Sequence, residues 1–389
     1  MSQSCAVCKK IAVQSCSACN TTYYCSKEHQ KSHWKVHKNA CAPFKTTSDE
    51  FGKTLIAIRN IEPKEKIVIK LPLIIGPVSE KEIICISCYK KIDQKSNSIC
   101  PKCGLKLCGK LCENREEHIE LCKIFETQNI NAEKCTNLFK FLIPLKILIL
   151  KTTNFKKFDI IMSNYLYEEP RECFKNVLDE LLTLCGKLGI STTNEELSKI
   201  YVMSKRNFLE INHTKSSLIK GLYPVIPLLK QNCVPNTKRI FSEDANKLTV
   251  LSTILIKKGE TLTSNFAEPL WGTLDRQSYL RTTKFINCSC VRCKDPTELN
   301  IYTSSIYCQK CKDKLLEDKS PKIVSTNPLD LEASWKCEKC DNEILAKQIA
   351  FGNKSLAREI NNINMEQPKC LEHFYLNMGK FFIQLILSV

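Results

Sequence analysis

Residues 5–41 read CAVCKKIAVQSCSACNTTYYCSKEHQKSHWKVHKNAC, and residues 85–122 repeat the same type of cysteine and histidine spacing. Each stretch carries eight candidate ligands: Cys5, Cys8, Cys16, Cys19, Cys25, His29, His37 and Cys41 in the first, and Cys85, Cys88, Cys100, Cys103, Cys108, Cys112, His118 and Cys122 in the second. A CxxC pair puts two thiolates on one tight turn, where they can share a tetrahedral zinc ion at about 2.3 Å. At about 40 residues each, the stretches are too short to bury an adequate hydrophobic core. We therefore predict two zinc modules whose folding depends on metal.

The composition is that of a globular chain, because 43% of the 389 residues are hydrophobic and 25% are charged. The N-terminus has no apolar signal-peptide core. The longest apolar runs, NLFKFLIPLKILIL and FFIQLILSV, are too short or too interrupted by lysine to cross a bilayer. Without a secretion signal, 25 cysteines with CxxC spacings indicate reduced thiolates on metal rather than disulfides. We expect a soluble protein of the nucleus and cytoplasm with no membrane partner.

Strand-like and helix-like patterns alternate along the rest of the chain. Residues 52–77 mix β-branched and polar residues around a turn signal at Glu62-Pro63-Lys64, which predicts short strands. From about residue 125 to 200 the apolar residues follow helical spacing, and Gly189 is a candidate helix stop. Strand patterns return from Gly221 onwards. We therefore expect an α+β fold whose strands are split by inserts.

The first stretch, closed by YYCSKEHQKSHWKVHKNAC, resembles a MYND zinc finger, with His29 where most such fingers carry cysteine. Either donor suits zinc. His33 and Trp34 are expected to pack on the closing helix.

The second stretch interrupts a strand-rich part of the sequence. This arrangement is similar to the split SET architecture of the SMYD family, particularly its arthropod SmydA branch. The segments GLYPVIPLLKQNCVPNTKRIF, KKGETLTSNFAEPLWGTLDRQSYL and KFINCSCVRCKDPTEL follow in the family's order.

This resemblance covers nearly the whole chain and implies a zinc-rich α+β protein built on a split SET β-fold. The expected segments are a MYND finger at 1–44, the SET N-terminal lobe at 46–80, an inserted MYND-like zinc module at 81–125, a helical insert at 126–200, the SET core at 201–272, a post-SET segment at 273–298, a zinc ribbon at 299–345 and a helical C-terminal segment at 346–389. The apolar end of the last segment suggests that it belongs to a larger helical domain.

The resemblance also implies how the metal ligands group. MYND fingers interleave their pairs, which gives the sets Cys5, Cys8, Cys25 and His29; Cys16, Cys19, His37 and Cys41; Cys85, Cys88, Cys108 and Cys112; and Cys100, Cys103, His118 and Cys122. Post-SET segments join one earlier cysteine to three later ones, here Cys233 with Cys288, Cys290 and Cys293. A zinc ribbon then comprises Cys308, Cys311, Cys337 and Cys340. These 21 cysteines and 3 histidines would fill about six zinc ions. The cysteines left over, expected as buried thiols in helices, are Cys135, Cys173, Cys185 and Cys370.

The formal charge of +17 favours a nucleic-acid partner only until the thiolates are counted. Zinc-bound cysteine is deprotonated, so three sites with one histidine carry −1 each and three all-cysteine sites carry −2 each, which lowers the net charge to about +8. The lysines are also dispersed rather than gathered in one run with interleaved aromatic residues. Direct nucleic-acid binding is therefore not expected.

The resemblance implies lysine methylation, in which S-adenosyl-L-methionine is held with its methyl group in line with a lysine amine. The family's motifs for this task are altered here. Its GxG turn becomes Gly52-Lys53-Thr54, where threonine tolerates positive φ poorly, so we expect another local shape. Its NHSCxPN motif becomes KQNCVPN, so that Lys230 and Gln231 replace the asparagine and histidine that hold the cofactor.

The residues around the substrate channel also depart from the family's pattern. The tyrosine that orients the lysine amine becomes Phe266, which keeps the aromatic ring and loses the hydroxyl. In the channel motif that begins at Asn207, a bulky Phe208 takes the place of a small residue. Tyr223 is a further channel position, and it cannot be assumed to replace the missing hydroxyl.

These observations favour a SET and MYND zinc protein that acts in transcriptional or chromatin regulation through protein contacts, with methyl transfer weak or lost. The MYND finger would dock proline-rich peptides, as it does in the family, and the groove would take histones or other lysine-bearing proteins. An alternative is an active, S-adenosyl-L-methionine-dependent protein-lysine methyltransferase in which the substitutions are tolerated. A third alternative, a nucleic-acid-binding zinc protein, predicts a steep salt dependence of binding.

Overall fold

A computed structural model describes residues 4–16, 22–49, 52–77, 84–92, 98–135, 137–164, 174–211, 219–242, 246–311 and 321–352. The chain divides into two compact units. Unit 1 comprises residues 1–230 and 235–264, and unit 2 comprises residues 231–234 and 265–389. The short strand β11 (Lys230–Gln231) contains the boundary between them. Cys19, Cys173, Cys370 and the end of the C-terminal segment, 353–389, lie outside the described residues.

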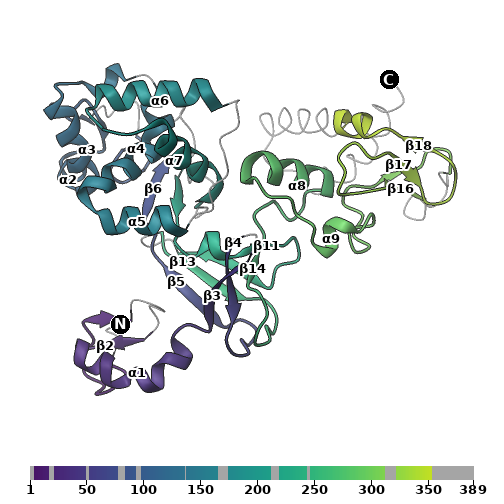
Figure 1. The fold of residues 1–389 in the computed structure, drawn as a ribbon, viewed down its shortest axis with the longest axis horizontal. Coiled ribbons are helices and arrows are strands. Elements are labelled where there is room, and N and C mark those ends of the chain that lie inside the picture. Colours follow the sequence, from purple (N-terminus) through teal and green to yellow (C-terminus); the bar gives the residue numbers. More distant parts are fainter. Residues whose placement is uncertain are drawn as a thin grey trace. The chain divides into compact units, whose positions relative to one another are not determined.

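Each zinc-type module of unit 1 consists of a small strand pair followed by helix (Figure 1). In the first module, β1 (Gln14–Ser15) pairs with β2 (Tyr23–Tyr24), and α1 (Lys27–Cys41) follows. Ser26 caps α1 by accepting a hydrogen bond from the His29 N–H, which fixes the first turn where His29 lies. In the second module, β7 (Ser98–Ile99) pairs with β8 (Lys106–Leu107), before α2 (Lys110–Glu113) and α3 (Glu116–Thr127).

Strands from both sides of the second module pair with each other, so the split β-fold is confirmed. β5 (Lys66–Lys70) pairs with β13 (Leu248–Ser252), which also pairs with β12 (Thr237–Phe241). β6 (Ile74–Pro77) pairs with β10 (Ile219–Leu222), which pairs with β9 (Phe208–Glu210). β3 (Phe44–Asp49) and β4 (Gly52–Ala57) form a hairpin, and the Leu262 N–H donates to the Leu55 carbonyl in β4 at 2.9 Å. β14 (Thr263–Ser264) ends this part of unit 1.

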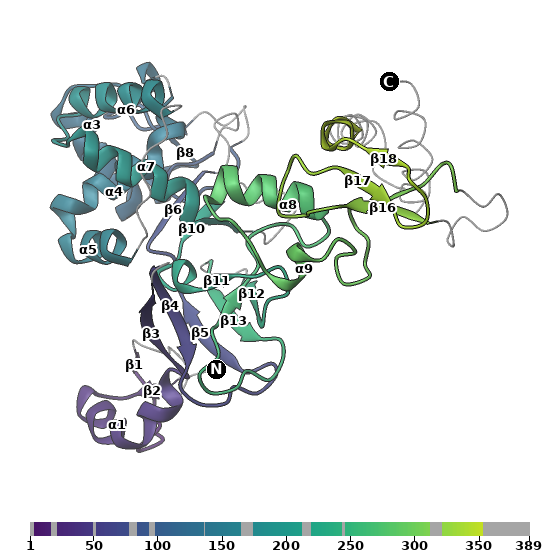
Figure 2. The same cartoon turned by 45° about the vertical axis from the view of Figure 1, so that its right-hand side comes forward.

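The helical insert is built around one helix that is apolar on nearly every side. Helix α4 (Leu138–Thr153) lies among the other helices of the insert in both views (Figures 1 and 2). They are α5 (Phe155–Asn164), α6 (Lys175–Lys187) and α7 (Asn194–Asn207). Leu142, Leu145 and Ile147 are all fully buried, because helices and strand β6 cover α4 on several sides. α7 continues to Asn207, past the expected boundary at 200.

Two of the turn signals form as expected, and one glycine is required by packing. The Glu65 N–H donates to the Glu62 carbonyl, and Lys64 takes φ +67°, which closes the turn before β5. Gly189 takes φ +65° just after α6, a left-handed conformation that suits a helix stop. At Gly76 in β6, an added Cβ would overlap the side chain of Ile143 in α4. The absence of a side chain there allows the helix to lie directly on the strand.

Unit 2 contains short helical elements and a small antiparallel sheet. Its helices are α8 (Thr273–Tyr279), the π-helical turn η4 (Leu280–Lys284) and α9 (Val291–Lys294). The sheet has the strand order β15 (Ile306–Tyr307), β16 (Lys322–Ser325), β17 (Trp335–Cys337) and β18 (Glu343–Ile344). Trp335, Ile323 and Cys308 form its small core. A helical turn follows at 346–352, where the described part of the chain ends.

Two shorter 3-10 turns complete the described elements of unit 1: η1 (Ala132–Lys134) before α4, and η3 (Ile226–Leu228) between β10 and β11. Cys135 follows η1 and is only half-buried, so its expected place inside a helix is wrong. Cys185 in α6 is buried, as expected, and this burial raises the pKa of its thiol to about 11. Among the described residues, no helix is both long and apolar enough to cross a membrane.

Candidate functional site

The cysteines and histidines come together in sets of four that match the expected groups. In each set the ligand atoms lie within 4.8 Å of one another. The sets are Cys5, Cys8, Cys25 and His29; Cys85, Cys88, Cys108 and Cys112; Cys100, Cys103, His118 and Cys122; Cys233, Cys288, Cys290 and Cys293; and Cys308, Cys311, Cys337 and Cys340. The first three belong to unit 1 and the last two to unit 2.

The spacing within the sets fits zinc. Four sulfur atoms at about 2.3 Å from one tetrahedral ion lie about 3.8 Å from each other. The sulfur–sulfur distances are 3.5 Å for Cys88 and Cys108, 3.8 Å for Cys100 and Cys122, and 3.7 Å for Cys308 and Cys340. These distances are far longer than a disulfide bond, and the described cysteines are all free thiols. Thiolate and imidazole donors in tetrahedral sets are the ligands that zinc prefers, so these clusters are zinc-binding clusters.

In the first finger, a histidine completes a set that usually has four cysteines. The Nδ1 atom of His29 lies 3.2 Å from the Cys25 sulfur and 3.6 Å from the Cys5 sulfur. Cys5 is fully buried, which by itself raises the pKa of the thiol. Backbone N–H groups of the CxxC turn and of Cys25 outweigh that effect and lower the pKa of Cys5 to about 5. The turn therefore favours the thiolate that a metal needs.

The other half of the first finger is partly described. The Cys16 and Cys41 sulfurs lie 3.4 Å apart, and Cys19 is outside the described residues. The His37 ring is buried and its Nδ1 atom lies 3.3 Å from the Thr22 hydroxyl, which fixes the ring orientation. Trp34 was expected to pack on α1, yet it is 46% exposed, with only an edge-to-face contact to His37 at 6.1 Å.

The second module orients its histidine in the same manner. His118 Nε2 lies 3.4 Å from the Cys103 sulfur, while Nδ1 lies 2.7 Å from the backbone carbonyl of Glu113. A carbonyl partner on one ring nitrogen fixes the tautomer that presents the other nitrogen to a metal. The carbonyl comes from the end of α2, so this short helix serves to position the ligand.

In unit 2, amide side chains face the sulfurs of both sets. Gln231 Nε2 lies 3.5 Å from the Cys233 sulfur and 3.9 Å from the Cys288 sulfur. Asn342 Nδ2 lies 3.5 Å from the Cys308 sulfur in the ribbon. A hydrogen bond with the neighbouring Cys288 thiol lowers the pKa of Cys233 to about 7. Amide N–H groups beside thiolates are typical outer-shell partners of a metal site.

The expected cofactor turn is part of a regular hairpin. Gly52 takes φ +110°, a conformation that favours glycine, while Lys53 and Thr54 continue as strand β4 opposite β3. The Lys53 ammonium donates to the carbonyl of Ser163 at 2.9 Å. Thr54 is buried, and its hydroxyl has no hydrogen-bond partner among the described residues. Threonine at the second glycine position is thus accommodated by an extended backbone.

The expected channel residues of unit 1, and the expected cofactor position Lys230, are engaged in the fold itself. Tyr223 is fully buried and its hydroxyl donates to the Asn246 carbonyl at 2.6 Å, and burial raises the pKa of its phenol. Asn207 is buried at the end of α7 and donates to the Met203 carbonyl at 3.3 Å. Lys230 is exposed, and its backbone N–H donates to the Leu262 carbonyl at 3.1 Å.

In unit 2, Phe266 packs against the Cys233 set, together with Leu280 and Ala267. Its ring is therefore next to the metal ligands. Gln231, expected only as a substituted cofactor position, directs both ends of its amide within unit 2: Nε2 towards the sulfurs, and Oε1 towards the Phe266 N–H at 2.7 Å. The spacing of the motif gave no sign of these contacts.

A buried ion triad beside this set is a feature that sequence reasoning missed. Arg276 is fully buried and donates to Glu298 at 2.8 Å, and Arg292 donates to the same oxygen at 3.1 Å. Hydrogen bonds from Ser304 and Arg276 outweigh the burial that raises the pKa of Glu298, so its pKa stays lowered. Arg276 Nη2 also lies 3.9 Å from the Cys293 sulfur. Nothing in the spacing of these three residues marks them as a group.

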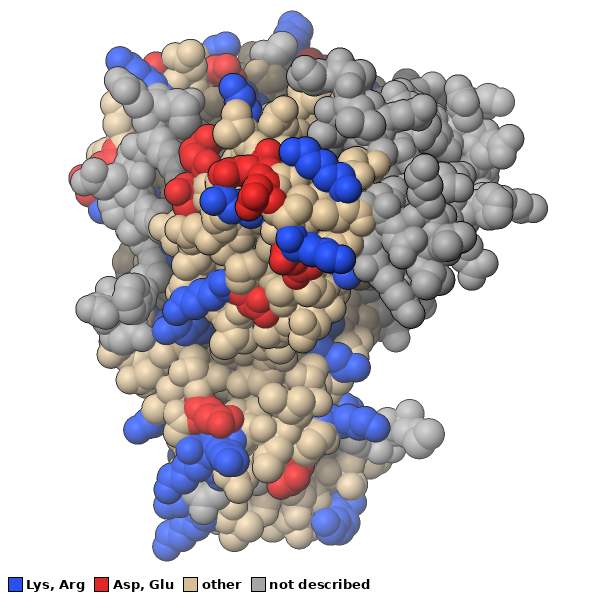
Figure 3. All heavy atoms as spheres, turned by 90° about the vertical axis from the view of Figure 1, so that its right-hand side faces the viewer, with Lys and Arg blue, Asp and Glu red and all other residues tan. Residues whose placement is uncertain are grey.

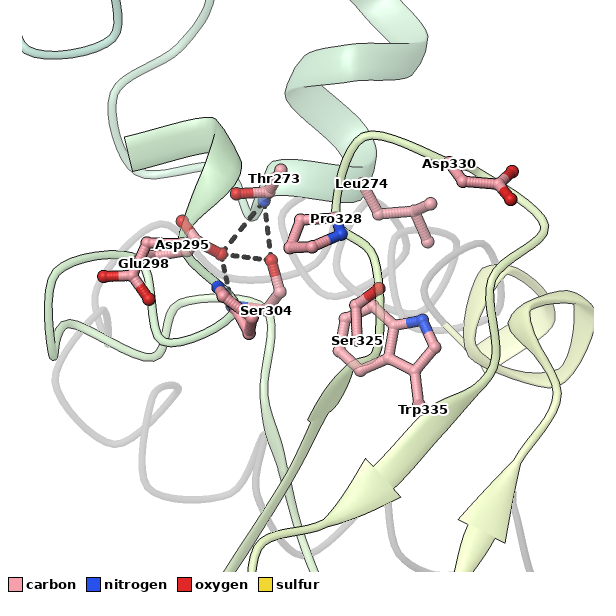
Figure 4. A pocket seen from close by; sticks show the side chains of 10 residues that line it. Thr273, Leu274, Asp295, Glu298, Ser304, Ser325, Pro328, Asp330 and Trp335 are labelled. Carbon is pink, nitrogen blue, oxygen red and sulfur yellow. Dashed lines mark hydrogen bonds between the residues drawn. The ribbon is translucent and has the colours of Figure 1, made fainter. Parts of the chain in front are cut away.

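A small pocket lies next to the triad, between α8 and the sheet of unit 2. Figure 4 shows Thr273, Ser304 and Glu298 joined by hydrogen bonds on one side of it, with Trp335 on the other. It offers about 10 Å³ of free volume, roughly the space of one water molecule. The pocket is therefore a packing feature and has no room for a substrate.

Charged side chains are mixed on the face drawn in Figure 3. Lys and Arg lie among Asp and Glu across its described part, without one uninterrupted basic surface. That distribution differs from the basic stripe of a dedicated nucleic-acid interface.

Comparisons with known proteins agree with the zinc clusters and the split fold. Residues 5–41 match the MYND finger family model. SET domain-containing protein SmydA-8, isoform B, of Drosophila melanogaster is 26% identical over 344 residues, 81% of this chain and 71% of that protein. Human histone-lysine N-methyltransferase SMYD3 is 23% identical, over 94% of this chain and 66% of that protein.

Among solved structures, Rubisco LSMT bound to sinefungin and monomethyllysine matches with a TM-score of 0.30 and 15% identity. The match covers 67% of this chain and 56% of that one, and the chain spans just over half the length of the solved structures that it matches. The finger model covers residues 5–41, and the SmydA-8 and SMYD3 relatives extend over most of the chain. The chain is therefore similar over most of its length to SET and MYND domain-containing proteins of the SMYD family, including the arthropod SmydA-8.

Proposed function

We propose that this protein is a zinc-stabilised SET and MYND scaffold that acts through protein recognition in transcriptional or chromatin regulation, with methyl transfer weak or lost. The observation that carries the proposal is the state of the residues that the family uses for catalysis. Phe266 has no hydroxyl, and Gln231 directs its amide to thiols and to a backbone N–H. Neither side chain can supply the polar contacts that orient a methyl donor and an amine.

The expected weakening of cofactor binding follows from hydrogen bonds. Each hydrogen bond that is removed while its partner stays buried costs on the order of 1–3 kcal/mol. Removing two would weaken binding of S-adenosyl-L-methionine by tens to thousands of fold. Tyr223 is a poor replacement for the missing hydroxyl, since its own hydroxyl is already committed to the Asn246 carbonyl.

Calorimetry with S-adenosyl-L-methionine on the zinc-loaded protein tests the proposal. We expect no binding in the micromolar range, with human SMYD3 as a positive control prepared in the same way. A micromolar dissociation constant, or transfer of a radiolabelled methyl group to a histone or another lysine-bearing protein, would favour the alternative of an active lysine methyltransferase. That alternative is supported by relatives named as histone-lysine N-methyltransferases, including SMYD3 and ASHR1 of Arabidopsis thaliana.

The zinc content is part of the proposal. We infer about six ions per chain, one for each set of four ligands, with Cys19 completing the set of Cys16, His37 and Cys41. Elemental analysis of purified protein should give about six zinc atoms per chain. A value near three would mean that half of the sets serve another purpose.

Partners and location follow from the same features. The first finger exposes the apolar side chains of Ile11, Val13, Trp34 and Val36, and we propose that exposed apolar residues of the finger contact proline-rich peptides. Direct nucleic-acid binding is not proposed, and the affinity of the protein for random DNA should show no steep dependence on salt.

We propose that the protein resides in the nucleus and the cytoplasm, which a fluorescent fusion imaged in cells would test. Signal confined to a membrane compartment would contradict it.

A further inference from the structure

The set of Cys233, Cys288, Cys290 and Cys293 has more polar side-chain contacts than its four ligands require. Two different side chains direct N–H groups at its sulfurs, and both are buried or half-buried within unit 2. Gln231 Nε2 reaches Cys233 and Cys288, and Arg276 Nη2 reaches Cys293. N–H donors stabilise sulfur-centred negative charge, so this arrangement suits metal-bound thiolates better than neutral thiols.

The charged side chains around the Cys233 set also favour metal-bound thiolates. Arg276 and Arg292 bring two positive charges to one carboxylate, Glu298, and all three side chains are at most 6% exposed. Among the described residues, one positive charge is therefore left without a carboxylate partner in a buried region. A zinc ion with four thiolates carries a charge of −2. The contact of Arg276 with Cys293 lets that charge offset the surplus cation.

Gln231 has a second contact that reaches beyond the metal ligands. Its Oε1 atom accepts the Phe266 N–H at 2.7 Å, and its Nε2 atom also lies 3.4 Å from the Asn265 Oδ1. One amide thus connects the sulfurs to the backbone of the segment that carries Phe266. Glutamine is long enough to make both contacts, and its two ends supply the donor and the acceptor that they require.

We propose that Gln231 is a positioning residue, which stabilises the zinc-thiolate set through Nε2 and holds the Phe266 backbone through Oε1, with Arg276 as the second donor to the sulfurs. This role of Gln231 requires only that a metal ion occupies the Cys233 set, and it goes beyond the proposed function. It holds whether or not methyl transfer occurs.

Two substitutions in the full-length, zinc-loaded protein separate the contacts. Gln231→Glu is nearly equal in size, keeps an acceptor for the Phe266 N–H and removes the donor to sulfur. Gln231→Met removes both. Asn342→Leu is the matched control, because Asn342 makes the same kind of N–H contact with Cys308 in the ribbon. Outer-shell substitutions at metal sites cost about 10-fold to 100-fold in affinity.

The first measurement is the rate at which N-ethylmaleimide modifies each cysteine in the presence of a chelator, read by peptide mass spectrometry. Both Gln231 variants should expose the Cys233 set about 10-fold to 100-fold faster, while the ribbon and the fingers keep the wild-type rate. Asn342→Leu should accelerate only the ribbon cysteines. Wild-type rates at the Cys233 set in both variants would overturn the proposal, and so would equal acceleration at every set, which indicates a general loss of folding.

Two further readouts distinguish positioning from simple packing. Hydrogen exchange at the Phe266 amide should accelerate in Gln231→Met and stay near wild type in Gln231→Glu, because glutamate keeps the acceptor. In cobalt-substituted protein, loss of the N–H donor should shift the sulfur-to-cobalt absorption to longer wavelength, since the sulfur electrons become less stabilised. An unshifted spectrum together with equal exchange in both variants would contradict a role of the Gln231 amide.

Discussion

Replacing Glu298 with glutamine should destabilise unit 2 more than any change on its surface. The carboxylate is 1% exposed and accepts hydrogen bonds from Thr273 N and Ser304 N, each at 3.0 Å, from the Ser304 hydroxyl and from the guanidinium groups of Arg276 and Arg292. Glutamine keeps the shape and one acceptor oxygen, but it removes the carboxylate charge that two buried guanidinium groups share. Breaking a buried ion pair in this way costs about 3–5 kcal/mol.

Tryptophan fluorescence during urea unfolding of the zinc-loaded protein measures this cost. Two of the three tryptophans, Trp271 and Trp335, belong to unit 2. A Trp34→Phe background removes the signal from unit 1. At a slope of about 1–3 kcal/mol per molar urea, the midpoint for unit 2 should fall by about 1 M or more. Glu343→Gln, which removes a half-exposed ion pair with Lys336, serves as the control and should shift the midpoint far less, because exposed ion pairs contribute little to stability.

The same substitution should alter the pH dependence. The folded-state pKa of Glu298 lies below the ordinary value of 4.5, because bonds from Ser304 and Arg276 outweigh burial. Its stabilising contribution is therefore complete above about pH 4.5 and is lost as the pH falls through the lowered folded value. The difference between wild type and Glu298→Gln should shrink in acid. A midpoint shift no larger than that of Glu343→Gln at pH 7 would refute the reasoning about the triad.

Three other perturbations test the fold. Leu142→Ala, in the fully buried part of α4, should cost about 2–5 kcal/mol in urea unfolding of unit 1, and an effect below about 1 kcal/mol would contradict its place in the core. Gly76→Ala should cost about 1–3 kcal/mol because its Cβ meets Ile143, whereas Gly186→Ala, with open space around it in α6, should be neutral or stabilising. Thorough chelation should abolish the circular-dichroism signal of α1 and the resistance of the finger to proteolysis, and a finger that stays compact without metal would refute its dependence on zinc.

Much of the architecture was predictable because its signals are local. A CxxC pair occupies one turn, so the sequence shows which thiols can share a metal, and the five described sets contain the ligands expected for them. The split of the strands also followed from sequence, since strand patterns stand on both sides of the inserts. The turn at Lys64 and the stop at Gly189 depend on single residues and their preferred φ values.

The sequence by itself showed which cysteines and histidines have metal-ligand spacing and that Phe266 lacks a hydroxyl, because both depend on residue identity and short spacing. The grouping of the ligands into sets came from the family resemblance. Only the tertiary structure decided which side chains surround the ligands and the other site residues. Glu298 reaches two arginines that sequence patterns leave unconnected, Gln231 points at sulfur, and Trp34 is exposed on a helix where packing was expected. Burial and countercharge are properties of the whole packed unit, since a side chain's environment comes from segments distant in the chain, and no local pattern records them.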